Sequence, residues 1–276
     1  GFYLVCPSHL RHQRRALEVL GVDASDVPEG APYASAPAPG LGCGSMCEEH
    51  ARLLYPRIAA AFRTREAAEW ERALGAAGVP GAAHRTLEEW GDDPHAHDAG
   101  LVTADGLANV GWLREARHVA PAPMPASDLC LAGVTVVDMC NVIAGPTIGC
   151  MLARFGADVV KVDPPTPTYS PEVAVLYGLA ANRGKRSVLL DAAADRAALE
   201  ALLRTADVLL VNCTAACLAR MRLTPDEVRE LNPRLVVARF DAWSGPVEDA
   251  GHLAAYNGYD DCVQAAIGIT AHFGGG

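Results

Sequence analysis

The second half of this 276-residue chain alternates short apolar runs with segments of helical pattern. The runs are dominated by Val and Leu, which is typical of parallel strands buried on both faces and joined by helices. The expected strands are 134–138, 159–162, 187–190, 208–211 and 235–240, and the expected helices are 145–155, 194–206 and 225–231. The sequence therefore predicts an α/β fold with a Rossmann-like parallel-sheet half-domain that begins near the middle of the chain.

The first 119 residues have a different pattern. An apolar strand is expected at the start, an amphipathic helix at 8–20 and another helix at 46–62, with a Pro- and Gly-rich loop at 28–43 between the helices. A third helix is expected to begin with Thr64 as its N-cap. We therefore predict a small, mainly helical α+β domain over 1–119, a Pro-rich linker over 120–130, and an incomplete large domain over 131–276.

Composition excludes several classes of function. The net charge of −10 and the lack of a dense basic stretch argue against nonspecific nucleic-acid binding. No apolar run is long enough to cross a bilayer. The 9 cysteines include no CxxC pair, which favours a reducing, cytoplasmic location over a disulfide framework and leaves no metal site predicted. Cys213 and Cys217 would share one face of a helix, but we interpret them as small apolar residues.

Several segments together resemble a known enzyme family. LAGVTVVDMCNVIAGP, NRGKRSVLLD, ADVLLVNC, LNPRLVVARF and YNGYDDCVQAAIG occur here in the order found in the N-terminal half of family III CoA-transferases. This is the CaiB/BaiF type, which includes formyl-CoA transferase, carnitine CoA-transferase and alpha-methylacyl-CoA racemase. The earlier stretch RTREAAEWERALGAAGVP, followed by DPHAHDAG, resembles the small domain of the same family.

The family's small domain normally follows the first half of the large domain, whereas here it comes first. The simplest interpretation is a piece of a longer tandem polypeptide, and a circular permutant is the alternative. The resemblance implies an interlocked homodimer or a tandem fusion partner. It also implies acyl-CoA and a carboxylic acid as substrates, with coenzyme A as substrate and no prosthetic group.

Two predicted CoA-binding segments lie near the start of the sheet. The resemblance places Ile143 and Ala144 against CoA, although without it a plain strand-to-helix turn is the favoured interpretation of these residues. It places Leu190 and Asp191 along the adenosine end of the ligand. Just before them, Lys185 and Arg186 could bind the phosphates, or they could simply form a solvated basic loop. Both interpretations of the two cations stay open.

A third segment follows the strand at 208–211. It contains Asn212, Cys213 and Thr214, with Arg220 further on. The family motif is kept at Asn212 and Arg220, but Cys213 replaces an aromatic residue that would lie against the ligand. Loss of that stacking contact weakens the expected CoA affinity by about 1 kcal/mol.

The fourth segment opens a helix with Asn257, Gly258, Tyr259 and Asp260. The resemblance places Asp260 at the border of the active site, with an auxiliary role, although an acidic residue in a first helical turn also stabilises the helix. Racemases of the family carry His where this chain has Tyr259. Because Tyr releases its proton only far above neutral pH, a transferase is favoured over a racemase.

The family's catalytic step needs an Asp nucleophile, which this register places after Gly276. The chain alone is therefore expected to be inactive. Two alternatives remain, a non-catalytic CoA-binding or scaffolding module and an acyl-CoA racemase. Of the remaining candidates, His95 and His97 are expected to face solvent, and Trp70 and Trp90 are expected to be packing residues.

Overall fold

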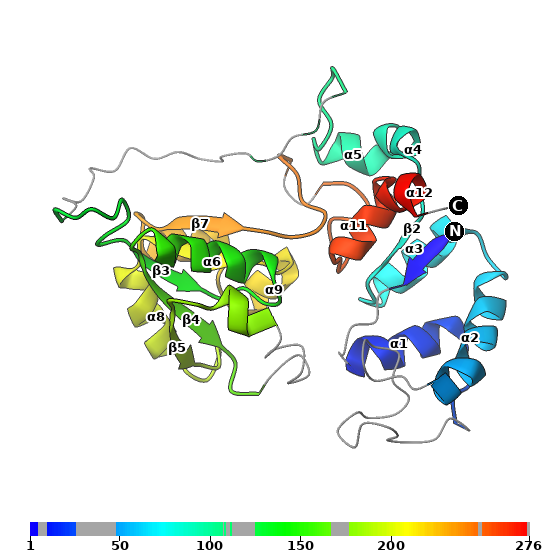
Figure 1. Ribbon diagram of the computed structural model, residues 1–276, viewed down its shortest axis with the longest axis horizontal. Coiled ribbons are helices and arrows are strands. Elements are labelled where there is room, and N and C mark those ends of the chain that lie inside the picture. The colour runs from blue at the N-terminus through cyan, green and yellow to red at the C-terminus, as the bar shows by residue number, and fades with distance from the viewer. Residues whose placement is uncertain are drawn as a thin grey trace. The chain divides into compact units, whose positions relative to one another are not determined.

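The computed structural model describes residues 1–4, 10–25, 48–106, 108, 111, 125–166, 177–247 and 250–274 (Figure 1). The chain forms two compact units. Unit 1 comprises Gly1–Trp112 and Ala242–Gly276, and unit 2 comprises Leu113–Asp241. The loop predicted at 28–43 and residues 120–124 of the predicted linker lie outside the described residues.

Unit 2 contains a five-stranded parallel sheet. Its strands are β3 (Thr135–Asp138), β4 (Asp158–Asp163), β5 (Arg186–Leu189), β6 (Val208–Val211) and β7 (Val236–Arg239). Their spatial order is β5-β4-β3-β6-β7, and every neighbouring pair is parallel. The predicted α/β fold class and all five predicted strands are confirmed.

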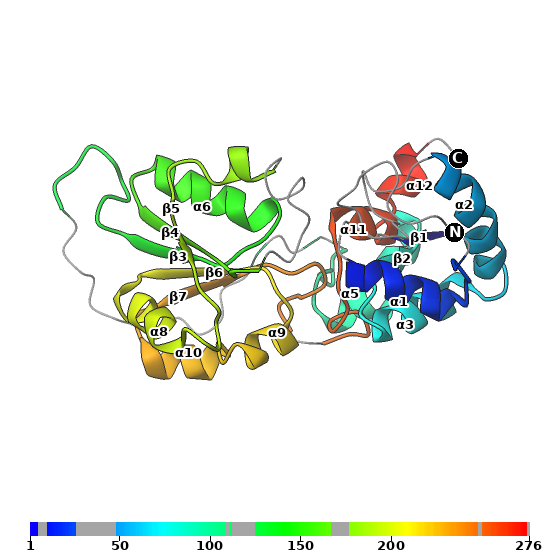
Figure 2. The same cartoon turned by 90° about the horizontal axis from the view of Figure 1, so that it is seen from below.

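Helices cover both faces of this sheet. They are α6 (Ala144–Arg154), α8 (Arg196–Thr205), α9 (Ala215–Arg220) and α10 (Pro225–Leu231), and residues 177–181 are also helical. Figure 2 shows α6 on one face and α8, α9 and α10 on the other. The crossovers between parallel strands supply these helices, as a doubly wound sheet requires.

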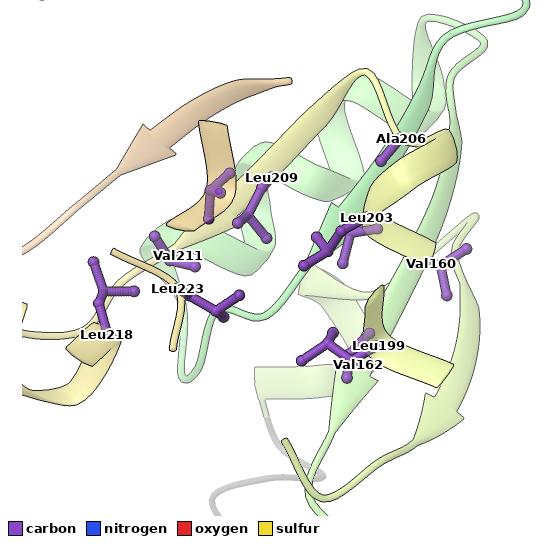
Figure 3. Packing of buried hydrophobic residues seen from close by; sticks show 11 residues of the cluster. Val160, Val162, Leu199, Leu203, Ala206, Leu209, Val211, Leu218 and Leu223 are labelled. Carbon is purple, nitrogen blue, oxygen red and sulfur yellow. The ribbon is translucent and has the colours of Figure 1, made fainter. Parts of the chain in front are cut away.

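The strand residues alternate between two apolar cores. On β3, Val136 packs with the cluster that includes Ile148 and Leu152 of α6, whereas its neighbour Val137 packs with Leu199 and Leu203 of α8. Figure 3 shows the second cluster, to which α8, β6 and the segment around Leu223 contribute. Because both faces are buried, the strands need apolar side chains at consecutive positions, which explains the continuous Val and Leu runs.

Unit 1 is mainly helical around a two-stranded antiparallel sheet of β1 (Phe2–Leu4) and β2 (Gly81–Ala83). Its helices are α1 (Leu10–Leu20), α2 (Glu48–Phe62), α3 (Ala67–Ala76), α4 (Leu87–Gly91), α5 (Pro94–Asp98), α11 (Asp260–Ala266) and α12 (Ile269–Phe273). Trp70 and Trp90 are buried in its apolar clusters, which confirms their predicted packing role. No helix in the described parts of the chain is long and apolar enough to cross a membrane.

The structure corrects one detail of unit 1. The N-cap of α3 is Glu66, not Thr64, and Glu69 completes its capping box. Thr64 instead donates its hydroxyl to the carbonyl of Ala61 at the end of α2, 2.7 Å away. Glu69 Oε2 accepts the N–H of Glu66 at 3.1 Å, which gives a backbone donor at the start of the helix its acceptor.

The C-terminal segment joins unit 1. Residues 242–274 follow β7 in the chain, and the sequence prediction grouped them with the large domain. In the structure, α11 packs against β1 and β2, and Trp243 and Leu253 share an apolar cluster with Trp90. The compact units are therefore a different division of the chain from the predicted domains.

Candidate functional site

The order of the strands defines one position in unit 2 where a ligand can enter. β3, the first strand of this sheet along the chain, lies in the centre, with β4 and β5 on one side and β6 and β7 on the other. The chain thus leaves β3 and β6 in opposite directions, and open parallel sheets bind ligands outside the carboxyl ends of the strands at such a position. The segments after these strands, 139–143 and 212–214, contain Ile143, Asn212, Cys213 and Thr214.

Asn212 joins the two segments. Its Oδ1 accepts the N–H of Asn141 at 2.8 Å, and its Nδ2 donates to the carbonyl of Asn141 at 2.8 Å. The amide thereby pairs with a whole peptide unit, as a neighbouring strand would, beyond the point where β3 and β6 end. Asn212 therefore fixes the position of the turn that leads into α6.

The turn itself has an uncommon backbone. Val142 adopts a φ of 68°, in the left-handed region that β-branched residues rarely occupy, at a cost of about 1 to 3 kcal/mol. Ile143 is the N-cap of α6 and is 46% exposed, but it carries no polar atom to cap the helix. At the start of α6 the N–H groups of Ala144 and Gly145 have no acceptor within the helix, whereas Pro146 has no N–H and the N–H of Thr147 donates to the carbonyl of Ile143 at 2.8 Å.

Lys185 lies inside unit 2. Its ammonium donates to Asp138 Oδ2 at 2.6 Å, to the carbonyl of Pro146 at 2.6 Å and to Asn182 Oδ1 at 2.9 Å. The Lys185 side chain is 1% exposed and that of Asp138 is 0% exposed. A Cβ at Gly149 would collide with this pair. The three N–H donors of the Lys185 ammonium thus all have acceptors within the protein, and Lys185 holds β3, α6 and the segment before β5 together.

Arg186 and Asp191 also have protein partners. Arg186 is exposed and forms a two-pronged ion pair with Asp158 at the amino end of β4, with distances of 2.8 and 2.6 Å. Its guanidinium is therefore directed away from the carboxyl edge. Asp191 accepts the N–H groups of Ala193 and Ala194, and these bonds lower the pKa of its carboxyl. Leu190 follows β5 directly and lies at the carboxyl edge.

The segment after β6 leads into α9. Thr214 is the N-cap of this helix, and Arg220 is its last residue and is exposed. Cys213 lies before the helix, so it does not share a helix face with Cys217, and both residues are partly exposed.

The fourth predicted group belongs to unit 1. Asn257 donates to the carbonyl of Gly78 at 2.8 Å, and Gly258 packs so closely on Ala242 and Trp243 that a Cβ would not fit. Tyr259 is the N-cap of α11, and Asp260 in its first turn accepts a hydrogen bond of 2.6 Å from Gln264. The structure thus places Ile143, Leu190 and Asn212, with the predicted residues beside them, in segments that follow the carboxyl ends of strands in unit 2. Lys185 is buried, Arg186 pairs at the opposite edge, and the last four predicted residues belong to unit 1.

Sequence reasoning missed a buried ionic network in unit 1. Glu71 is 2% exposed, and both of its oxygens accept from Arg85, at 2.9 and 2.7 Å. Arg85 also donates to Asp93 at 2.9 Å, and His252 lies 3.8 Å from Glu71. Burial alone would raise the pKa of Glu71, but the nearby imidazole of His252 and hydrogen bonds from Arg85 and the N–H of Ala83 outweigh it and lower the pKa to about 2.

His95 was expected to face solvent, and this is wrong because it is 0% exposed. Its Nδ1 accepts the N–H of Leu253 at 3.2 Å, so Nε2 carries the proton and donates to the carbonyl of Trp243 at 2.9 Å. Two backbone partners satisfy the ring, which allows its burial. Burial lowers the pKa of His95 and keeps the ring neutral. The other histidine, His97, is exposed as expected.

No group of three or more His, Cys, Asp or Glu side chains suited to a metal ion occurs within the described parts of the chain.

Comparison with known families assigns the chain to one of them. The model for CoA-transferase family III matches residues 13–122 and 131–276, which is most of the sequence. The chain belongs to CoA-transferase family III. The resemblance on which the sequence analysis depended is thereby confirmed.

Two curated relatives show how much of a family III protein this chain covers. It is 29% identical to the CoA-transferase/lyase DddD of Marinomonas sp. (strain MWYL1) over 326 residues, covering 99% of this chain and 39% of DddD. It is 37% identical to a formyl-CoA:oxalate CoA-transferase of Rhodopseudomonas palustris (strain TIE-1) over 151 residues, covering 51% of this chain and 35% of that protein. The chain thus spans about two fifths of these relatives, and a single alignment with DddD runs through both family segments in their present order.

Among solved structures, one crystal form of Rv3272 from Mycobacterium tuberculosis aligns with a TM-score of 0.45 and 32% identity. The alignment covers 51% of this chain and 40% of that one.

Proposed function

We propose that this chain provides the CoA-binding part of a CoA-transferase that moves CoA between an acyl-CoA and a carboxylic acid. The observation that carries the proposal is the reversal of strand order between β3 and β6, at whose carboxyl ends Asn212 fixes the turn before α6. Membership in CoA-transferase family III supports the choice of CoA as ligand.

In this proposal each residue at this edge of the sheet has a distinct task. The N–H groups of Ala144 and Gly145 at the start of α6 bind an anionic or carbonyl oxygen of the ligand. Ile143 and Leu190 offer apolar surface to the adenosine and pantetheine parts, and Cys213 and Thr214 line the same edge. Arg220, exposed at the end of α9, supplies positive charge for a phosphate. Asn212 positions the turn.

The proposed reaction passes through an aspartyl-CoA thioester. A carboxylate attacks the donor thioester carbonyl, the C–S bond breaks, and a mixed anhydride and CoA thiolate form. The thiolate then attacks the aspartyl carbonyl and releases the donor acid. The acceptor carboxylate repeats these two steps in reverse, which restores the free Asp. We propose that this Asp comes from outside the present chain, in an interlocked dimer or a tandem unit, with Asp260 in an auxiliary role.

CoA binding by the 276-residue chain is the first test. Calorimetric titration with CoA is expected to show saturable, single-site binding, with desulfo-CoA as a matched ligand because the nucleotide end makes most of the proposed contacts. Absence of saturable binding for both ligands would show that the chain is a scaffolding module.

The second test separates the enzymatic proposal from a module that only binds CoA. The polypeptide in which this chain occurs is incubated with an acyl-CoA and an isotopically labelled carboxylic acid. A transferase moves label into acyl-CoA, and hydroxylamine converts the trapped aspartyl thioester to a hydroxamate that mass spectrometry locates. CoA binding without exchange of label would identify a non-catalytic CoA-binding module. The replacement of the motif's aromatic residue by Cys213 favours this alternative. Uptake of solvent deuterium at the α-carbon without exchange would identify a racemase.

A further inference from the structure

A buried ion pair between β3 and α6 holds the turn that joins these two elements at both of its ends. At the first end, Asp138 Oδ1 accepts the N–H of Cys140 at 2.9 Å. At the second end, the ammonium of Lys185 donates to the carbonyl of Pro146 at 2.6 Å. Lys185 and Asp138 are themselves joined at 2.6 Å. The pair thus connects the two ends of the turn and encloses residues 141–145 between them.

Two buried glycines of α6 allow the helix to lie directly on these groups. A Cβ at Gly149 would meet Asp138 Oδ2 and would lie 3.0 Å from Lys185 Nζ. A Cβ at Gly145, one helical turn earlier, would meet the side chain of Cys140. The ion pair and Cys140 therefore set how closely the first turns of α6 approach β3.

The turn between these two ends has a strained backbone. Val142 has a φ of 68°, and such a conformation persists only where the surrounding contacts fix it. The side chain of Asn212 holds Asn141, the residue directly before Val142. Asn212 thus fixes the middle of the turn, and the ion pair fixes its ends. The N–H groups of Ala144 and Gly145 lie within the segment that these contacts hold.

We propose that Lys185 and Asp138 are positioning residues of the site at this sheet edge, an inference that rests on the CoA-binding function proposed above. Neither side chain is placed to touch a ligand, because they are 1% and 0% exposed and all three ammonium donors have protein acceptors. The pair acts through the turn, whose fixed backbone presents the N–H groups of Ala144 and Gly145. Lys185 thereby orients the site and does not itself bind a phosphate.

The first experiment removes the pair without leaving a buried charge, and it needs no ligand. In the double variant Asp138→Asn/Lys185→Met, an amide oxygen can still accept the N–H of Cys140, but the hydrogen bond to Pro146 is lost. Amide hydrogen exchange at 141–147 should be about tenfold faster than in the wild-type chain, because a charged hydrogen bond is worth about this factor. Unchanged exchange at 141–147 would overturn the proposal.

The second experiment measures the dissociation constant of CoA by calorimetry, beside urea unfolding of the same proteins. Lys185→Met should lose stability and affinity together, since the carboxylate of Asp138 stays buried without its cation. The double variant should regain most of the lost urea midpoint and still bind CoA about tenfold more weakly than the wild type. Wild-type affinity in the double variant would overturn the proposal, because the pair would then only stabilise the fold.

Leu203→Ala is the matched control for lost stability. Leu203 is fully buried in α8, on the face of the sheet opposite α6 (Figure 2). Its truncation should lower the urea midpoint about as much as Lys185→Met does, and should leave CoA affinity and exchange at 141–147 unchanged. A tenfold loss of affinity in Leu203→Ala would contradict the proposal, because affinity would then follow stability.

The two experiments also separate this inference from the function on which it rests. If the wild-type chain binds no CoA, the proposed function is wrong, and the exchange rates at 141–147 still decide whether the ion pair fixes the turn. If the wild-type chain binds CoA and the double variant binds it equally well, the proposed function stands and the positioning role is wrong.

Discussion

The side chain of Asn212 and the backbone of Asn141, 71 positions apart in the sequence, form a reciprocal pair of hydrogen bonds of 2.8 Å each. The pair extends the contact between β3 and β6 past the end of the sheet, at the position where the strand order reverses. The site proposed for CoA thus depends on a turn that one amide side chain holds in place.

Replacement of that amide should affect both stability and binding. Asn212→Ala leaves the N–H and carbonyl of Asn141 without these partners, and we expect the free energy of unfolding to fall by about 1 to 3 kcal/mol. CoA affinity should fall as well, because the turn before α6 is no longer fixed. Urea unfolding followed by circular dichroism and calorimetric titration measure the two effects.

Asn232 provides the matched control for Asn212. Its buried amide donates to the carbonyls of Leu203 and Ala206, each at 2.9 Å, before β7 begins and therefore at the other edge of the sheet. Asn232→Ala should cost a similar amount of stability and leave CoA affinity unchanged. Equal loss of affinity in both variants would mean that the effect at Asn212 reflects general destabilisation.

The buried pair of Lys185 and Asp138 predicts a large stability effect. Lys185→Met leaves the carboxylate of Asp138 buried without its cation, which should cost about 3 to 5 kcal/mol. Lys161→Met is the comparison, because its partner Asp163 is 39% exposed and stays hydrated, so the cost should be below about 1 kcal/mol. Similar losses in the two variants, measured by urea unfolding, would contradict the assignment of Lys185 to the interior.

Glu71 should make unit 1 sensitive to acid. Its pKa is about 2 in the folded chain against an ordinary 4.5, so its contribution is complete above pH 4.5 and is lost as the pH falls toward 2. The shift corresponds to roughly 3 kcal/mol. Trp70, Trp90 and Trp243 are buried in unit 1, so intrinsic fluorescence reports its unfolding. Glu71→Gln should reduce the dependence of the unfolding free energy on pH between 4.5 and 2. Glu88→Gln, on the exposed side of α4, should leave this dependence unchanged.

His95 should act in a higher pH window. Because its folded pKa lies below the ordinary 6.5, the neutral ring stabilises unit 1 above pH 6.5 and this stabilisation is lost on acidification. The charges that face it are His252, Asp93 and Asp98. Thermal unfolding between pH 8 and 5 should show a falling midpoint in the wild type and a weaker dependence in His95→Gln. His97→Gln should behave as wild type, and a flat wild-type profile would argue against a neutral buried ring.

The sheet of unit 2 could be predicted because its strands need apolar residues on both faces. The apolar runs at 159–162 and 208–211 suit only a strand that is buried on both faces. The first lies within a strand and the second coincides with one. Helix ends were also accessible where capping is local, as at α10, whose Thr224 and Pro225 mark its start.

The contacts made by polar side chains could not be predicted in this way. Lys185 lies in a basic stretch typical of a surface loop, yet its partner Asp138 is 47 positions away. His95 depends on backbone groups of Trp243 and Leu253 that only the folded chain brings near. The signal for Asn212 was the family motif, and its bonds to Asn141 were visible only in the structure.

The location of bound CoA tests the account most directly. Amide hydrogen exchange of the 276-residue chain, followed by mass spectrometry, is compared with and without saturating CoA. We predict slower exchange at 141–147 and 212–217, the segments after β3 and β6, and no change at 232–236 on the opposite edge of the sheet. Unchanged exchange in both segments under saturating CoA, or protection confined to unit 1, would contradict the proposed site.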